Sequence, residues 1–135
     1  MSSVSVKVFR VEREAVLDKL KKWAQGLSRD KNVIAVVLFG SFAKGEETPA
    51  SDIDIVILLR DSQSRFDNRI VKFMPKGVGI GVDIFPYTLD EFNSSLQDGW
   101  GVASEVLKKG IILYSIDKDK ESLSFHEWFL KFKGL

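Results

Sequence analysis

The chain of 135 residues contains no cysteine and a single histidine, His126. The lack of cysteine excludes disulfide bonds, thiol catalysis and zinc sites built on thiolates. One histidine cannot build a histidine-rich metal site. The composition therefore excludes redox and zinc chemistry of the common cysteine and histidine types.

Long hydrophobic runs and an excess of one charge are also missing. Twenty Lys and Arg residues stand against 19 Asp and Glu residues, which leaves a formal net charge of +1. That balance does not predict a nucleic-acid binder. No apolar run is long enough to cross a membrane, and the N-terminal "MSSVSVKVFR" lacks the apolar stretch of a signal peptide. We therefore expect a cytoplasmic protein.

The elements that the sequence does contain alternate between helix and strand. Length and composition are ordinary for one domain with a real core, so we predict a single domain over residues 1–135. Short apolar runs predict strands at 33–39, 52–59, 78–87 and 111–114, the third of them closed by Pro86. Helical patterns cover 12–27, 62–76, 88–97, 102–109 and 117–132. For the first of these, the apolar residues at helical spacing are Val11, Ala15, Leu17, Leu20, Trp23 and Leu27. The alternation predicts an α/β (α+β) layer structure, a small mixed sheet of about four strands with helices packed on it.

Several helix details can be predicted from single residues. Thr88 followed by Glu91 three residues later predicts a capping box, and Gly110 is expected to end the preceding helix. The last helix carries Phe125, Trp128, Phe129 and Phe132 at helical spacing. We expect this face to dock on its own domain, with a patch for a second chain as the alternative. His126 is expected to be a packing residue rather than a ligand. Lys108 and Lys109 suit a helix C-terminus electrostatically, and a phosphate role is the alternative.

Two aspartates sit in a run that otherwise predicts a buried strand. Asp52 and Asp54 are two residues apart, so their side chains share one face of the strand. Like charges on one face raise each other's pKa unless a cation intervenes. Three explanations are open: a solvent-facing cap formed by Ser51 and Asp52, a basic partner from elsewhere, or a divalent metal ion, which prefers carboxylate oxygens.

A glycine and a serine directly follow the preceding strand. Gly40 permits a sharp turn and close approach of a ligand to the backbone. Ser41 is expected to be the N-cap of a single helical turn in "SFAK", where free N–H groups and a hydroxyl would bind phosphate. The alternative is an ordinary turn between strand and helix. The combination of Gly-Ser, three residues, Gly45 and then Ser51-Asp52-x-Asp54 is more specific than either part.

The pattern "GSFAKG…SDIDIVI" resembles the signature of the DNA polymerase β-like nucleotidyltransferase superfamily. The short chain is similar to its minimal nucleotidyltransferases (MNT), which are often antitoxin partners of HEPN-domain ribonuclease toxins. The resemblance covers residues 33–85 and implies the polymerase β-like palm fold. It also implies nucleotide binding by Gly40, Ser41, Lys44, Gly45 and Ser51. The family usually has Arg at the position of Lys44, and Lys lacks the planar two-pronged contact with phosphate.

The resemblance also requires a third carboxylate on a later strand, and "GIGVDIF" supplies Asp83. Strand alternation places Gly79, Gly81 and Asp83 on one face, while the isoleucines and valine between them face the core. An exposed carboxylate on an edge strand is the alternative. By resemblance, Asp52, Asp54 and Asp83 are the catalytic and metal-binding residues. They would hold two Mg²⁺ ions, and Mn²⁺ could replace Mg²⁺. Asp83 could also act as the base.

The resemblance implies an Mg-dependent enzyme that moves a nucleoside monophosphate, AMP from ATP, onto an acceptor hydroxyl. The chain has neither spare length nor basic excess for a nucleic-acid channel. A hydroxyl on a partner protein, a HEPN-type toxin, is therefore the expected acceptor. The alternatives are a non-catalytic antitoxin or nucleotide-binding module that acts by contact alone, and a nucleotide sensor.

Overall fold

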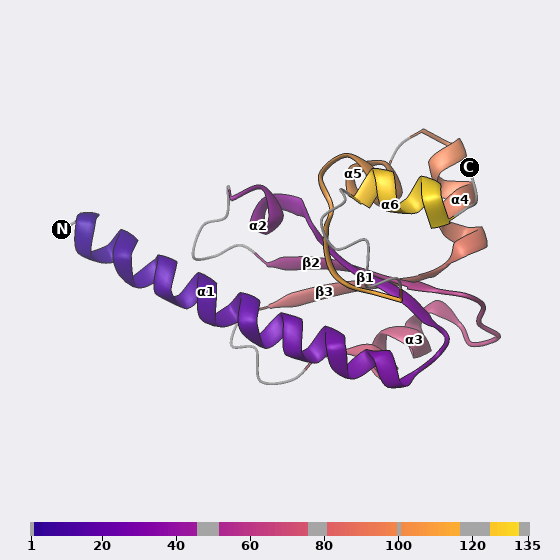
Figure 1. The fold of residues 1–135 in the computed structure, drawn as a ribbon, viewed down its shortest axis with the longest axis horizontal. Helices are drawn as coiled ribbons and strands as arrows, with labels where there is room; N and C mark the ends of the chain where they lie inside the picture. Colours follow the sequence, from indigo (N-terminus) through magenta and orange to yellow (C-terminus); the bar gives the residue numbers. More distant parts are fainter. Residues whose placement is uncertain (1, 46–51, 76–80, 100, 117–124, 133–135) are drawn as a thin grey trace.

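The computed structural model describes residues 2–45, 52–75, 81–99, 101–116 and 125–132, with only the backbone described for 2–12 and 131–132 (Figure 1). The strands are β1 (Val33–Phe39), β2 (Ile53–Leu59), β3 (Val82–Thr88) and β4 (Ile111–Ser115). They form one four-stranded sheet in the order β3-β2-β1-β4. The β2–β3 pair is parallel, whereas β1 is antiparallel to both β2 and β4. The prediction of a small mixed sheet is confirmed.

Helices cover both faces of this sheet (Figure 1). They are α1 (Ser2–Gly26), followed by a 3-10 turn (Leu27–Arg29), α2 (Gly40–Lys44), α3 (Phe66–Phe73), α4 (Leu89–Gln97), α5 (Val102–Lys109) and α6 (Phe125–Phe132). Residues of α1 and α3 pack on one face, and residues of α4, α5 and α6 pack on the other. All seven residues of β1 are buried. This double cover explains why the strand sequences are continuously apolar rather than alternating.

Helix α1 differs from its prediction in length and in the face it buries. It begins at Ser2 rather than near residue 12, because the β-branched valines at its start weaken the helical pattern that a sequence reader looks for. Val16, Leu20 and Ala24 are buried, whereas Ala15 is exposed. The buried residues are spaced by four, so the predicted apolar face was displaced by about one residue at Ala15.

Strand β3 continues through Pro86 to Thr88, so the prediction that Pro86 closes the strand is wrong. The strand order explains the difference, since β3 lies at the edge of the sheet. A proline lacks the N–H that a central strand needs, but an edge strand can leave that position unpaired. The two residues after Pro86 remain in register with β2, where Thr88 lies opposite Leu59.

The predicted helix ends are confirmed in α4 and α5. Glu91 N–H donates to Thr88 Oγ1 at 3.2 Å, and Thr88 N–H donates to Glu91 Oε1 at 2.8 Å, which is the expected capping box. Gly110 is the C-cap of α5, with Lys108 and Lys109 in its last turn.

The aromatic face of α6 docks on its own domain, as expected. Phe125, Trp128 and Phe129 are almost fully buried, and the rings of Phe125 and Phe129 contact Phe92 of α4. These three residues therefore do not form a patch for a second chain; the side chain of Phe132 lies outside the described residues. His126 is exposed rather than packed, because it points away from the buried side of the helix. Within the described ranges, no helix combines the length and apolarity that a membrane span needs.

Candidate active site at the end of the sheet

Strand pairing brings the predicted acidic residues to one end of the sheet. In the parallel β2–β3 pair, Asp54 lies directly opposite Asp83. Asp52 immediately precedes β2, and Gly81 immediately precedes β3. The N–H of Ile53, the first residue of β2, donates a hydrogen bond to the Gly81 carbonyl at 2.9 Å. Since β1 runs antiparallel to β2, its last residue, Phe39, also lies opposite Asp54. The turn that follows β1 therefore reaches the same end of the sheet.

Two glycines leave the space that two of the carboxylates occupy. A Cβ added at Gly40 would collide with the carboxylate of Asp54, and Gly40 also has a φ of +80°, which other residues rarely adopt. A Cβ added at Gly81 would collide with the carboxylate of Asp52. The sequence predicted that Gly81 clears space on the face of Asp83, but in the structure the side chain that fills this space is that of Asp52. The predicted Gly79 lies outside the described residues.

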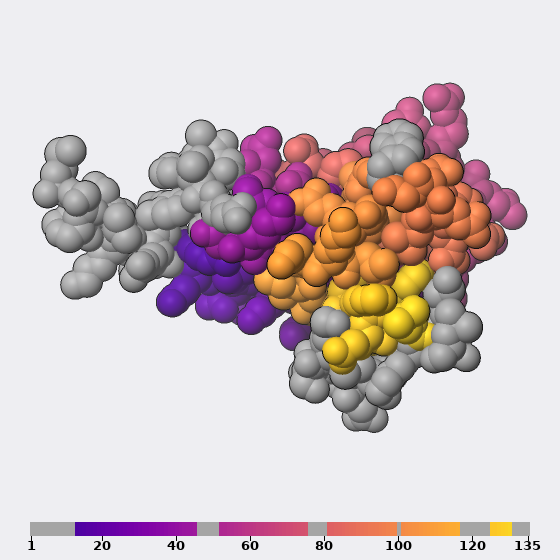
Figure 2. Space-filling model, turned by 90° about the horizontal axis from the view of Figure 1, so that it is seen from above, coloured from indigo at the N-terminus to yellow at the C-terminus, as the bar shows by residue number. Residues whose placement is uncertain are grey.

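The carboxylates interact strongly enough to alter proton binding. The pKa of Asp54 is raised to about 6, first by burial and then by the negative charges of Asp83, Glu105 and Asp52. Sequence analysis missed Glu105. No motif marks this residue, which belongs to α5 and reaches the site because α5 packs beside α2. Figure 2 shows the purple surface of α2 next to the orange surface of α5.

This arrangement suits a hard divalent cation, although the ligand set is not closed. Carboxylate oxygens are the donors that Mg²⁺ prefers, and a cation would relieve the repulsion that raises the pKa of Asp54. In the described part of the chain, however, no three Asp, Glu, His or Cys side chains are gathered so that they could hold a metal ion. Binding through Asp52, Asp54 and Asp83 together would therefore require the side chains to draw closer.

The turn after β1 forms a short helix, but Ser41 does not cap it. Helix α2 begins at Gly40, its N-cap is Phe39, and no side chain makes a capping hydrogen bond. Because the N-cap is Phe39, two residues before the expected Ser41, Ser41 falls inside the first turn, and the N-cap prediction is wrong. Gly45 ends the helix in the left-handed conformation, with its N–H directed to the carbonyls of Phe42 and Ser41.

Two side-chain contacts that were not predicted from the sequence hold α2 in place. The Arg13 guanidinium donates to the Phe42 carbonyl at 2.9 Å and lies 4.5 Å from the centre of the Phe42 ring. Lys44 Nζ lies 3.2 Å from Glu105 Oε1. The predicted phosphate ligand Lys44 is thus already paired with a carboxylate, while the predicted Ser51 lies outside the described residues.

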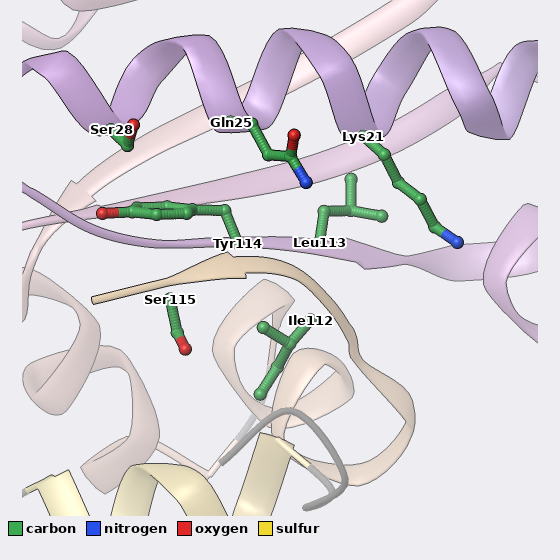
Figure 3. Close-up of a pocket in the computed structure, with 7 residues that line it drawn as sticks. All are labelled: Lys21, Gln25, Ser28, Ile112, Leu113, Tyr114 and Ser115. Carbon is green, nitrogen blue, oxygen red and sulfur yellow. The ribbon is translucent and has the colours of Figure 1, made fainter. Parts of the chain in front are cut away.

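A separate cavity of about 610 Å³ lies between α1 and β4 (Figure 3). Lys21 and Gln25 of α1 extend toward Leu113 and Tyr114 of β4. Among the described residues, none of those predicted to be catalytic or nucleotide-binding lines this cavity. The size of this cavity therefore does not identify it as the active site, and the aspartate end of the sheet remains the candidate.

Comparison with known proteins identifies the family of the chain. Residues 21–119 match the model of the family described as polymerase beta, nucleotidyltransferase. The chain belongs to this family. The matched region includes Asp52, Asp54 and Asp83 as well as the turn at Gly40 and Ser41. The nucleotidyltransferase type of the domain and its polymerase β-like fold are therefore confirmed.

Among curated proteins, the chain is similar to the bifunctional uridylyltransferase/uridylyl-removing enzyme of Burkholderia thailandensis, with 40% identity over 52 residues. That match covers 38% of this chain and only 6% of the much longer enzyme. The same enzyme from Burkholderia mallei matches over the same share of each chain. These relatives support the type of domain, and their whole-protein activities are not carried over.

Among solved structures, a Sulfolobus solfataricus protein provisionally assigned as a nucleotidyltransferase superposes with a TM-score of 0.56 and 21% identity, covering 79% of this chain and 86% of that one. A mutant of the toxin–antitoxin complex MntA–HpeT superposes with a TM-score of 0.51 and 19% identity, covering 87% and 85%. At these identities the two structures support the fold.

Proposed function

We propose that this domain transfers AMP from ATP onto a hydroxyl group of a partner protein in a reaction that depends on Mg²⁺. The observation that carries the proposal is the register of β2 and β3, which sets Asp54 opposite Asp83 beside the Gly40 turn. Repelling carboxylates next to the first turn of a helix, whose N–H groups have no partner within the helix, suit a cation and a phosphate chain. Membership of the nucleotidyltransferase family supports this reaction type.

In the proposed reaction, the acceptor oxygen forms a bond to the α-phosphorus of ATP, and the bond from that phosphorus to the bridging oxygen of the β-phosphate breaks. AMP becomes attached to the acceptor, and pyrophosphate leaves. A carboxylate oxygen of Asp83 would take the proton of the acceptor hydroxyl. Mg²⁺ held by Asp52, Asp54 and Asp83 would neutralise charge on the phosphates and lower the pKa of the acceptor hydroxyl.

The turn at α2 would position the phosphate chain. Backbone N–H groups at Gly40 and Ser41 can donate to phosphate oxygens, and Lys44 adds positive charge. These contacts place the α-phosphorus next to the carboxylates, and positioning of this kind supplies much of the rate in phosphoryl transfer.

The proposed acceptor is a HEPN-type toxin, with this chain as its antitoxin. The short chain resembles minimal nucleotidyltransferases, and its fold is similar to that found in the MntA–HpeT toxin–antitoxin complex. A tyrosine, serine or threonine hydroxyl of the partner would then serve as acceptor. The alternative, neutralisation by contact alone, has one observation in its favour, since the three aspartates are not gathered into a closed metal site in the described structure.

The deciding experiment is Asp83→Asn, which nearly preserves volume but removes the charge. The purified protein and its co-purifying partner are incubated with Mg²⁺ and ATP labelled at either the α- or the γ-phosphate. We expect only the α-label to reach the partner, and its transfer to slow by about 10²–10⁴-fold in the variant, as for loss of a general base. Binding of the partner should survive. Asp61→Asn, beyond the opposite end of β2, is the matched control and should retain transfer.

A cellular assay separates the enzyme from the contact antitoxin. If chemistry neutralises the partner, toxicity returns in Asp83→Asn although the two proteins still associate. Full suppression of toxicity by the variant, with no label transferred, would establish contact as the function and remove the transferase proposal.

A further inference from the structure

A pocket of about 560 Å³ lies beside the candidate site and has a cationic wall. It is lined by Lys44 at the end of α2 and by residues of α5 and the segment before it: Gly99, Gly101, Ser104, Glu105, Lys108 and Lys109. Lys108 and Lys109 stabilise the C-terminus of α5 electrostatically. Stabilising the end of α5 does not explain why Lys44, which belongs to α2, lines the same pocket. The presence of three ammonium groups in one pocket therefore needs an explanation beyond helix stability.

Glu105 is the one carboxylate among the described residues that line this pocket. It pairs with Lys44 at 3.2 Å, and the side chains of Lys44 and Glu105 remain 33% and 41% exposed. An ion pair as open to water as this one is weak, and an anion with several charges can replace one partner. The carboxylate of Glu105 also interacts with Asp54, so the same residue faces both the cationic wall and the acidic end of the sheet.

We propose that this pocket binds the polyphosphate of the nucleotide and that Glu105 is an internal anion that holds Lys44 until the polyphosphate displaces it. The inference rests on the proposed function, because it assigns the phosphate side of the same site. It adds Lys108, Lys109 and Ser104 as phosphate contacts. A polyphosphate offers charged oxygens to all three ammonium groups, whereas Glu105 supplies a single carboxylate.

The proposal predicts opposite effects for two changes in α5. The probe is inorganic tripolyphosphate, measured by calorimetry in the presence of a chelator so that no divalent metal contributes. Glu105→Gln should bind the probe about two- to fivefold more tightly, the range expected for removing an exposed competing ion pair. Lys108→Gln combined with Lys109→Gln should bind it about two- to tenfold more weakly, with a shallower dependence on salt.

Matched controls separate local contacts from net charge. Asp61→Asn removes one negative charge beyond the opposite end of β2, and Lys19→Gln with Lys22→Gln removes two positive charges from exposed positions of α1. Both should leave tripolyphosphate affinity near that of the wild type. Thermal melting of each variant confirms that it is folded.

Three results would overturn the inference. The first is an equal change of tripolyphosphate affinity in Glu105→Gln and Asp61→Asn, and the second is an equal change in the α5 and α1 lysine variants. The third is an α5 lysine variant that no longer binds a polyglutamate peptide but binds tripolyphosphate with normal affinity. The last result would assign the pocket to an acidic segment of a protein. The test is independent of the transfer assay. Opposite shifts in probe affinity without any label transfer would uphold the pocket and refute the proposed function.

Discussion

The two ends of β3 treat carboxylates in opposite ways. At the first end, Asp83 lies opposite Asp54 with Asp52 nearby, and the pKa of Asp54 is raised to about 6. At the other end, the pKa of Glu91 is lowered, chiefly by its hydrogen bond with Arg69. The ordinary pKa values of Asp and Glu are similar, so the difference comes from the surroundings.

At the Arg69 end, a positive charge and a negative charge are paired through hydrogen bonds. Arg69 is buried, and its guanidinium contacts both carboxylate oxygens of Glu91, at 2.6 and 3.2 Å. It also donates to the carbonyls of Pro86 and Ser64, each at 3.0 Å. These bonds join α3, β3 and α4. The comparison teaches that one end of the strand stabilises the fold, while the other stores unfavourable charge that a bound cation would relieve.

The largest expected effect breaks the aspartate end. Asp52→Asn combined with Asp54→Asn should lower the affinity for Mn²⁺ by more than about 100-fold, as measured by calorimetry. This loss exceeds the one expected when a residue that only supports a metal ligand is removed. The metal-free variant should melt no lower than the wild type, because repulsion between carboxylates is removed. Unchanged Mn²⁺ affinity would show that the metal assignment is wrong.

The next effect breaks the Arg69 end. Arg69→Ala should lower the free energy of unfolding by about 2–3 kcal/mol, because it removes charged hydrogen bonds and the donor to the buried Pro86 carbonyl. Denaturant unfolding measures the loss, and Mn²⁺ affinity should stay the same. Arg65→Ala is the control, since Arg65 makes an exposed ion pair with Asp67, and should cost less than about 0.5 kcal/mol. Equal losses in both variants would contradict the role of Arg69.

A smaller effect tests whether the space beside Asp52 matters. In Gly81→Ala, the new Cβ must displace the Asp52 carboxylate, which is the end of a movable side chain. We expect Mn²⁺ affinity to fall about tenfold, as for other changes that disturb ligand orientation. The melting temperature should hardly change, because the φ of Gly81 is not in the left-handed region. A large loss of stability with normal Mn²⁺ affinity would instead make Gly81 a residue of the fold.

The smallest effect is a dependence on pH that has opposite signs at the two ends. The raised pKa of Asp54 means that its contribution to stability is present below about pH 4 and is lost as pH rises to about 6. In metal-free buffer, the melting temperature of Asp54→Asn minus that of the wild type should therefore increase as pH rises through that window. Above about pH 6 the difference should stay constant. Glu91→Gln should behave in the opposite way, since the lowered pKa of Glu91 makes its contribution disappear as pH falls.

Local chemistry made much of this structure predictable from sequence. The strand β1 was predicted with its observed bounds because its apolar run is short and flanked by polar residues and glycine. The capping box of Thr88 and Glu91 was predicted because both partners lie within four residues. The aspartates and the glycine turn were found for the same reason, as their spacing forms a pattern within one stretch of chain.

The rest depends on contacts between distant segments. Nothing near Glu105 in sequence indicates Lys44, since the two meet only when α5 packs beside α2. Arg69 looked like one more charged residue of a helix, and its burial follows from the edge position of β3. Ser41 was misplaced because α2 begins at Gly40, whose φ of +80° makes a sharp turn into the helix that propensity does not predict.

The proline in β3 also limits how the sheet can grow. An exposed edge strand invites another chain to add to it through unpaired N–H and carbonyl groups. At Pro86 an arriving strand would find no N–H, and the carbonyl already accepts a hydrogen bond from Arg69. This edge is therefore protected against strand addition and aggregation at its middle, and any sheet that extended across two molecules would be favoured at β4, the opposite edge.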